Sequence, residues 1–387
     1  MSVRTGLVGV VAVVAVVSVT AGAFASPALA DAPHRTGHRA TQQALDAAVA
    51  AGVPGVTGRA TDKYGTWKGT SGVGDLRTGA PRGERDRYRV GSITKTFVAT
   101  VLLQLEAEGR IDLDDTVDHW LPGVVTGHGH DGRKITLRQV LNHTSGIYNV
   151  TADKGFQQTV FARDGFLKHR YDTWTPDELV RIAMSHKPDF APGTSWNYSN
   201  TNYVLAGMVI QKVTGHSYAD EIRRRVIEPL HLRATTLPGT STTVPRPASR
   251  AYSKFPDDPD KKTYDVTELN PSLASSAGEM ISDSADLNRF YSALLGGRLL
   301  PAAQLAEMKT TVPVPLGEDG AEVGYGLALM SQKLSCGTVV WGHSGGIHGS
   351  SSDAVTTSDG RHSLAFNFNG DWSGDSQAVM EAEYCPK

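Results

Sequence analysis

The sequence is short of cysteine and has no excess of either charge. Its 387 residues contain two cysteines, and 38 lysines and arginines nearly balance 40 aspartates and glutamates. No block of like charge stands out, which argues against a nucleic acid or an anionic membrane surface as the main partner. Without repeats or low-complexity segments, the composition is that of an ordinary globular protein.

Clusters of metal ligands are also missing. The segment "TGHGHDGR" (126–133) holds two histidines but no cysteine or carboxylate at ligand spacing. The segment "PDDPDKK" (256–262) lacks the glycine and the terminal glutamate of a calcium-binding loop. We interpret both as surface loops and expect neither a metal nor a cofactor.

Long hydrophobic runs are absent except at the N-terminus. There Arg4 precedes "LVGVVAVVAVVSVTAGAF", and "SPALA" ends at Ala30. A positive start, an apolar core and an A-x-A site predict a secretory signal peptide over residues 1–30. The alternative is a membrane anchor, which needs about 20 apolar residues and usually has no cleavage site. We expect residues 31–387 to be secreted, without a stable membrane anchor.

Export has a consequence for the two cysteines, Cys336 and Cys385. In an oxidising compartment they are expected to form one disulfide. Two separate buried thiols are the alternative. A catalytic cysteine is disfavoured because neither residue has a basic neighbour in the sequence.

The order of the predicted elements indicates the fold class. A helix over about 41–51 is followed by short strands within 53–90, and a helix that begins at Ser92 stops at Gly109. Helical patches and irregular loops fill residues 110–290. Strands then return in "EVGYGLALM", "CGTVVWGH" and "SDAVTTSDGRHSLAFNF", before a last helix over about 375–383.

This pattern predicts an α/β (α+β) protein in which one antiparallel sheet is built from both ends of the chain, flanked by helices. A mainly helical lobe is inserted into it. We expect residues 31–387 to form a single domain. Its α/β lobe would span about 31–108 and 288–387, and its helical lobe about 109–287.

Three short motifs can carry chemistry. In "RVGSITKTF", Ser92 and Lys95 stand one helical turn apart at a predicted strand-to-helix junction. The apolar run that follows would bury Lys95 and lower its pKa towards that of a base. The alternative is a serine that caps the helix beside a solvated lysine.

The other two motifs are weaker when taken alone. In "SWNYSNTNYVL", Tyr198 and Asn200 would point to the same side of an extended segment, although a turn with a packed tyrosine and a capping asparagine explains them as well. In "VVWGHSGGIHG", His343 ends a β-branched run, and the glycines after it would let a ligand approach the backbone.

Together and in this order, the motifs resemble those of the penicillin-recognising serine hydrolases. The Y-S-N and H-S-G forms are similar to those of the soluble secreted D-alanyl-D-alanine carboxypeptidases and their class C β-lactamase-like relatives. The segments "LNHTSGIY", "APGTSWNYSNTNYVLAGM", "SSAGEMIS" and "YGLALMSQKLSCG" extend the resemblance over nearly all of residues 31–387. It implies a β-lactamase/transpeptidase-like fold.

The resemblance also implies a mechanism. Ser92 would attack a carbonyl, with Lys95 and Tyr198 sharing the role of base, and Tyr198, helped by His343, would protonate the leaving nitrogen. The oxyanion would lie between the backbone N–H groups of Ser92 and Gly346. The implied substrate-binding residues are Asn200, Ser344, Gly345, Gly346, Thr151, Leu273 and Met330.

Three positions depart from the carboxypeptidase pattern. Leu273 stands where the relative has an aromatic lid, and Gly346 stands where it has a second threonine. Met330 replaces an arginine that holds the terminal carboxylate of the substrate, and methionine cannot make that bidentate contact. Lys333 is near in sequence but falls on the opposite face of the strand.

We therefore weigh three functions for what we expect to be a monomer. The first is D-Ala-D-Ala carboxypeptidase or transpeptidase chemistry on peptidoglycan peptides, with β-lactam binding. The second keeps the acyl-enzyme but changes the substrate, as in an esterase, a D-amino-acid amidase or a β-lactamase. The third is a binding module without catalysis, which the presence of every acylation residue disfavours.

Overall fold

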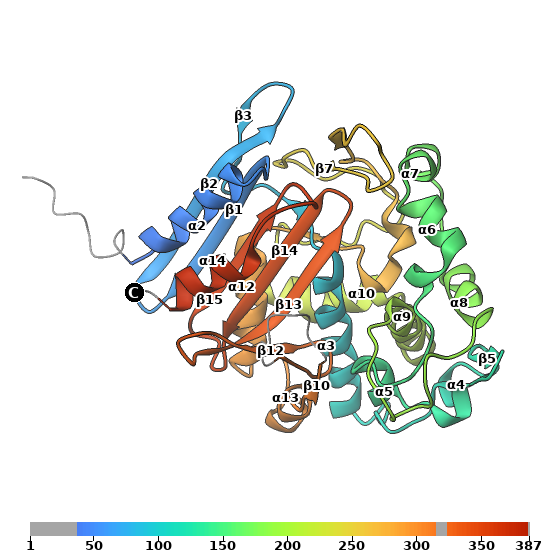
Figure 1. The fold of residues 1–387 in the computed structure, drawn as a ribbon. Helices are drawn as coiled ribbons and strands as arrows, with labels where there is room; N and C mark the ends of the chain where they lie inside the picture. Colours follow the sequence, from blue (N-terminus) through green and yellow to red (C-terminus); the bar gives the residue numbers. More distant parts are fainter. Residues whose placement is uncertain (1–36, 315–322, 386–387) are drawn as a thin grey trace, which may run out of the picture.

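The computed structural model describes residues 37–314 and 323–385, so the predicted signal peptide lies outside the described residues. Within the described part, nine strands form one antiparallel sheet in the order β10-β11-β12-β13-β14-β15-β1-β2-β3. Figure 1 shows the first strands of the chain, in blue, beside its last strands, in red. The sheet built from both ends of the chain is thus confirmed. The strands are β1 (Gly55–Asp62), β2 (Gly65–Asp75), β3 (Ala80–Pro81), β10 (Val312–Pro313), β11 (Val323–Tyr325), β12 (Met330–Lys333), β13 (Val339–Ile347), β14 (Ser350–Thr357) and β15 (Ser363–Phe368).

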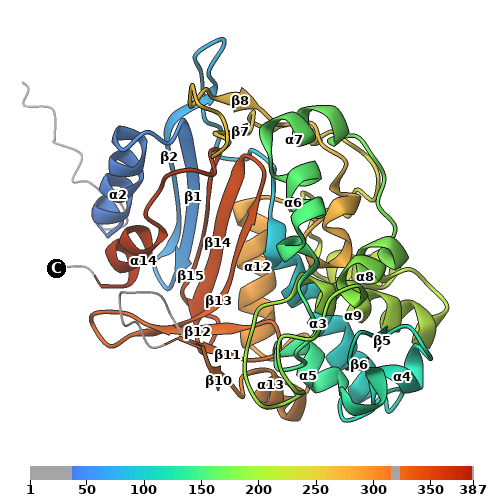
Figure 2. The same cartoon turned by 45° about the vertical axis from the view of Figure 1, so that its right-hand side comes forward.

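Helices cover both faces of the sheet. On one face α2 (Arg39–Ala50) and α14 (Ser376–Tyr384) pack against each other, and on the other α12 (Ser284–Leu295) packs on β14, β15 and β1 (Figure 2). The disulfide between Cys336 and Cys385 ties the turn after β12 to the end of α14. On the chain-entropy argument, a bridge that closes 49 residues contributes about 4 kcal/mol.

Most of the helices lie in the middle of the chain. These are α4 (Val117–Trp120), α5 (Leu137–Leu141), α6 (Lys154–Val160), α7 (Arg163–His169), α8 (Pro176–Met184), α9 (Asn200–Thr214), α10 (Tyr218–Ile222) and α11 (Glu228–Leu230), and α13 (Ala302–Met308) follows α12. A capping box of Thr175 and Glu178 begins α8. The proposed lobe boundary near 288 falls inside α12, and the division into lobes stays a prediction.

The central helix α3 (Thr94–Ala107) lies in the main hydrophobic core. It is buried almost all round, and it packs against α9, α10 and α13. The short strand β4 (Tyr88–Arg89) leads into it and pairs with β9 (Ile281–Ser282). Because the same core surrounds α3 on all sides, the side chains in its first turn are held rigidly.

One predicted strand is wrong in its extent. The run "EVGYGLALM" forms the short strand β11, and a tight turn follows before β12 begins at Met330. In that turn the Gly326 amide donates to the Leu329 carbonyl, and Ala328 has a φ of +56°. The apolar run is therefore buried as a turn under the sheet, a solution that its hydrophobicity alone does not distinguish from a strand.

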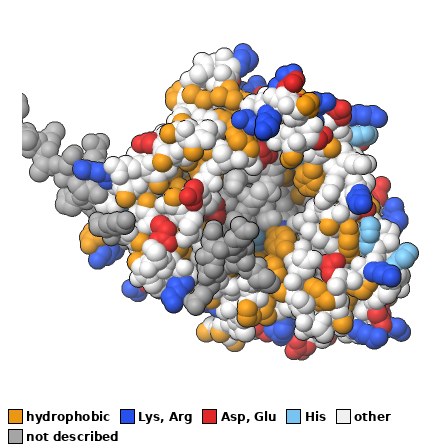
Figure 3. Space-filling view, in the orientation of Figure 1, with side chains coloured by type: hydrophobic (Ala, Val, Ile, Leu, Met, Phe, Trp, Pro, Cys, Tyr) orange, Lys and Arg blue, Asp and Glu red, His pale blue; other side chains and the backbone are white. Residues whose placement is uncertain are grey.

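The surface has no dominant charge. Figure 3 shows acidic and basic side chains scattered over one face, without a large block of either sign. Among residues 37–314 and 323–385, no helix is long and apolar enough to cross a membrane.

Candidate active site

Ser92 lies where β4 passes into α3. A 3₁₀ turn over Gly91–Ile93 precedes the helix, and neither the turn nor α3 receives a hydrogen bond from a capping side chain. Ser92 therefore does not cap the helix, and the capping explanation of the motif is wrong. Gly91 has a φ of +52°, a conformation that favours glycine and that turns the chain sharply just before Ser92.

Lys95 is completely buried and points at Ser92. Its Nζ lies 3.0 Å from Ser92 Oγ, 2.8 Å from Asn200 Oδ1 and 2.8 Å from the Ala277 carbonyl oxygen. The last two atoms can only accept a hydrogen bond, so they take two N–H groups of the amine. In the protonated amine the third N–H donates to Ser92 Oγ; in the neutral amine a lone pair faces the serine hydroxyl instead, which is the arrangement of a nucleophile and its base.

Burial sets the protonation of this site. Desolvation lowers the pKa of Lys95 well below its usual value. The Tyr198 ring lies under the amine, with Nζ 4.8 Å from the ring centroid. Burial raises the pKa of Tyr198, and the neighbouring Ser92 hydroxyl offsets part of that rise. Tyr198 Oη is buried and has no well-formed hydrogen bond among the described residues, which leaves the phenol free to meet a substrate.

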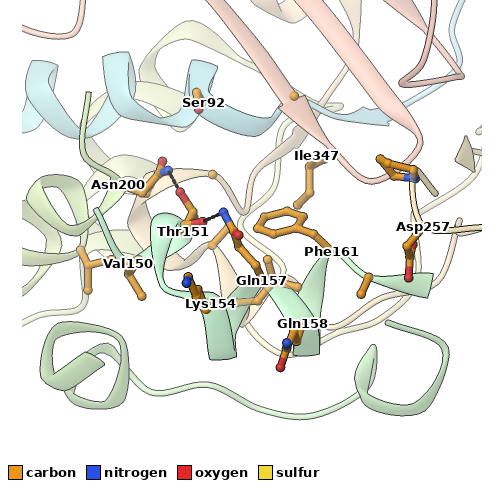
Figure 4. A pocket seen from close by; sticks show the side chains of 18 residues that line it. Ser92, Val150, Thr151, Lys154, Gln157, Gln158, Phe161, Asn200, Asp257 and Ile347 are labelled. Atoms are coloured by element: carbon orange, nitrogen blue, oxygen red, sulfur yellow. Dashed lines mark hydrogen bonds between the residues drawn. The ribbon is translucent and has the colours of Figure 1, made fainter. Parts of the chain in front are cut away.

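Asn200, the first residue of α9, orients Lys95. Its Oδ1 accepts from the amine, while its Nδ2 lies 3.3 Å from Thr151 Oγ1 and its backbone N–H donates to Asn149 Oδ1. Figure 4 shows Asn200 and Thr151 together beside Ser92. The side-chain amide of Asn200 therefore positions Lys95 through a hydrogen bond, in addition to its predicted contact with the substrate.

Strand β13 forms the opposite wall and runs against the serine segment. A Cβ atom added at Gly345 would lie 2.0 Å from the Val90 carbonyl oxygen and 2.9 Å from the Ser92 nitrogen. Only glycine allows so close an approach. At Gly346 the equivalent position meets nothing within 4 Å, so this residue opens towards the cleft. This approach brings the backbones of Gly346 and Ser92 together, so that their N–H groups can serve as the two donors of the predicted oxyanion hole.

His343 lies in the wall of the cleft, but its ring nitrogens are bonded within the protein. Ser344 and Gly346 are exposed, whereas His343 and Gly345 are buried, as alternation along a strand requires. The imidazole Nε2 lies 3.0 Å from Tyr325 Oη, and Nδ1 is bonded to the Ser344 carbonyl oxygen. Both ring nitrogens are therefore engaged with partners other than the predicted leaving group.

Two cavities meet at Ser92 and Gly346. The larger, about 600 Å³, is lined by apolar residues that include Leu273 and by polar ones that include Lys154 and Asp257. Figure 4 shows Phe161 and Ile347 in its apolar wall. The smaller, about 250 Å³, is lined by Trp196, Tyr198, Tyr325, Met330, His343 and the 344–346 backbone. Of the predicted substrate-binding residues, Thr151 and Leu273 face the larger cavity and Met330 faces the smaller one.

The structure thus brings every predicted site residue to one place, and it adds some that the motifs do not contain. His143, Trp196, Tyr203 and Tyr325 form an aromatic layer beneath Tyr198. His143 and Tyr325 lie in "LNHTSGIY" and "YGLALMSQKLSCG", which the sequence singles out only through the resemblance. His143 has a φ of +64°, an unusual conformation for a residue other than glycine, and the sequence around it gives no local signal of this.

Comparison with known families agrees with this geometry. The model of the family named Beta-lactamase matches residues 39–380. The chain belongs to the Beta-lactamase family. Its members with this fold are serine hydrolases that form an acyl-enzyme, and the mixed α/β fold with its large antiparallel sheet is the fold of that family.

Relatives within the family include amidases and penicillin-binding proteins. A solved D-stereospecific amidohydrolase from Streptomyces sp. is 63% identical with a TM-score of 0.86, covering 90% of this chain and 99% of that one. The D-amino acid amidase of Ochrobactrum anthropi SV3 is 30% identical with a TM-score of 0.76, covering 89% and 97%. Penicillin-binding protein 4* of Bacillus subtilis is 28% identical, covering 80% of this chain and 67% of that protein. The match to penicillin-binding protein 4 of Amycolatopsis lactamdurans, at 29% identity, spans only 61% of that relative.

Proposed function

We propose that this protein is a D-stereospecific amidohydrolase that acylates Ser92 with the acyl part of a D-amino-acid amide, ester or short peptide. The observation that carries the proposal is the 63% identity to the Streptomyces amidohydrolase over nearly the full length of both chains. Of the functions weighed from the sequence, amidase action has better support than carboxypeptidase action.

The proposed reaction uses the geometry of the site directly. Ser92 Oγ attacks the amide carbonyl carbon as its proton passes to Lys95 Nζ, and the carbonyl oxygen becomes an oxyanion held by the N–H groups of Ser92 and Gly346. The C–N bond then breaks while Tyr198 Oη delivers a proton to the leaving amine. Water attacks the ester carbonyl by the reverse route, which releases the acid and restores the Ser92 hydroxyl.

The two cavities suggest which part of the substrate each one receives. The larger cavity has the volume of a small-molecule site, and its apolar walls suit an acyl group with a hydrophobic side chain. The smaller cavity would receive the leaving group. Among the described residues that line it there is no lysine or arginine, and Met330 stands at its edge.

This lining argues against a leaving group with a free carboxylate. A buried carboxylate needs a cation or several hydrogen bonds, and an apolar thioether supplies neither. Penicillin-binding relatives keep D-Ala-D-Ala carboxypeptidase action as a second candidate. The two functions differ in the charge of the group that leaves.

A turnover assay separates these functions. We expect the kcat/KM for D-phenylalanine amide to exceed that for its L enantiomer by at least about tenfold. When the carbonyl is held at Ser92, the cavity accommodates the side chain of only one enantiomer. An acyl-D-Ala-D-Ala peptide is expected to release D-alanine more slowly than the D-amide releases ammonia. The S92A variant gives the background rate for each substrate. Equal rates for the enantiomers, or preferred cleavage of the peptide, would refute the amidase proposal.

A further inference from the structure

The hydroxyl of Tyr325 lies between two buried imidazoles. Its Oη is 3.2 Å from His143 Nε2 and 3.0 Å from His343 Nε2. The three side chains are at most 3% exposed. His143 follows α5, Tyr325 ends β11 and His343 lies on β13, so three distant segments meet at one phenol.

The position of the ring proton can be derived for both imidazoles. The backbone N–H of Ser199 donates to His143 Nδ1 over 3.2 Å, so that nitrogen carries no proton. The Asn202 amide lies 3.2 Å from the same nitrogen. Neutral His143 must then carry its proton on Nε2 and donate it to Tyr325 Oη. Tyr325 then has its own O–H left to donate, and two acceptors face it: His343 Nε2 and Tyr203 Oη, whose own proton goes to the Leu141 carbonyl oxygen.

The same reasoning fixes the state of His343. Its Nδ1 faces the Ser344 carbonyl oxygen, which can only accept, so the single proton of the neutral ring lies on Nδ1 and the bare Nε2 accepts from Tyr325. The imidazole therefore has no N–H to offer to a leaving group. The network runs from the Y-x-N segment to the H-x-G strand, and it links the two walls of the cleft.

His143 also supports Tyr198. The two rings pack with their centroids 4.3 Å apart, and Ser199, the donor to His143, is the next residue after Tyr198. One imidazole therefore holds both the ring and the backbone of the segment that carries the phenol. A displacement of His143 would move Tyr198 relative to Ser92.

We propose that His143 and Tyr325 are positioning residues that fix His343 as the neutral Nδ1–H tautomer and orient Tyr198. The proton for the leaving amine then comes from Tyr198 alone, and His343 serves to hold β13 in place. This assignment revises the role of His343 implied by the sequence resemblance. Its kinetic part rests on the proposed amidohydrolase function.

The charged and titratable groups that face these imidazoles favour their neutral forms. Lys95, Tyr198 and Tyr325 surround His343, and burial followed by the Lys95 charge lowers the pKa of His343 to about 3. Tyr203 also packs on His143, whose pKa is held well below its usual value by burial and then by Lys95 and His343. Both rings therefore stay neutral throughout the neutral pH range.

Nuclear magnetic resonance tests the tautomers without any substrate. Long-range proton–nitrogen correlation spectra of the protein with ring-labelled histidine show which nitrogen carries the proton, and the H143Q and H343Q variants assign the two rings. We expect protonation at Nε2 of His143 and at Nδ1 of His343 from pH 5 to pH 9. A proton on Nε2 of His343, or titration of either ring in that range, would overturn the proposal.

Kinetics tests the positioning role. The Y325F variant loses only the hydroxyl group and keeps nearly the same side-chain volume. We expect kcat to fall by about 10- to 100-fold and KM to change by less than about threefold, because the reacting groups lose their alignment. Y384F is the matched control, since it removes another buried hydroxyl, bonded to two backbone carbonyls beneath the far face of the sheet. A lower melting temperature with unchanged kcat in Y325F would show that the network stabilises the fold without positioning the reacting groups, and this would contradict the proposal. If the wild type fails to hydrolyse the D-amide, the proposed function fails, while the spectra still decide the tautomers.

Discussion

Replacement of Lys95 by methionine is expected to lower kcat/KM for a D-amino-acid amide by about 10²- to 10⁴-fold, the range that a general base contributes. The reason is the lone pair that faces Ser92 Oγ at 3.0 Å, which methionine cannot supply. Arginine is expected to be equally inactive, because a guanidinium stays protonated at any working pH. Steady-state kinetics with the D-amide measures the loss.

The pH dependence follows from the same amine. A base works only in its neutral form, so kcat/KM should rise as pH increases through the pKa of Lys95, which burial holds well below its usual value. The control is K212A, which removes an exposed lysine at the end of α9. Retention of substantial activity in K95M, while its thermal unfolding stays cooperative, would show that another group is the base.

The second large effect is expected at Gly345. In G345A the new methyl group would lie 2.0 Å from the Val90 carbonyl oxygen, and backbone atoms cannot yield as a flexible side chain can. Strand β13 must then move away from Ser92, and the oxyanion donors lose their spacing. We expect kcat/KM to fall by about 10²- to 10³-fold, the value of one such donor.

The neighbouring glycine provides the comparison. In G346A the added methyl group meets nothing within 4 Å, and the backbone N–H remains. The loss of kcat/KM in G346A should therefore be smaller than that in G345A by at least about tenfold. Equal losses in the two variants would indicate that β13 does not depend on close approach to the serine segment.

Much of the fold could be predicted because its signals are local. The Thr175–Glu178 capping box and the stop of α9 at Gly215, with a φ of +76°, follow from side-chain chemistry and backbone freedom. The turn at 326–329 could not be predicted in this way. There an apolar run is buried as a turn, because contacts from distant segments decide its conformation.

The site shows the same division. Ser92 and Lys95 are one helical turn apart, so their contact can be derived from the sequence. The roles of Asn200 and His343 cannot be derived in this way, since they depend on which atoms of α3 and β11 lie opposite them. Asn200 holds Lys95, and His343 turns towards Tyr325, as only the tertiary structure can show.

The most direct test is to trap the acyl-enzyme. The protein is mixed in separate samples with the methyl esters of D- and L-phenylalanine, and each reaction is quenched in acid. Mass spectrometry then measures the intact mass of the protein, and peptide mapping locates the modified residue. The account predicts a mass increase of one phenylalanyl group on Ser92 with the D ester, much less with the L ester, and none in S92A. An adduct on another residue, or D-ester turnover that persists in S92A, would contradict it.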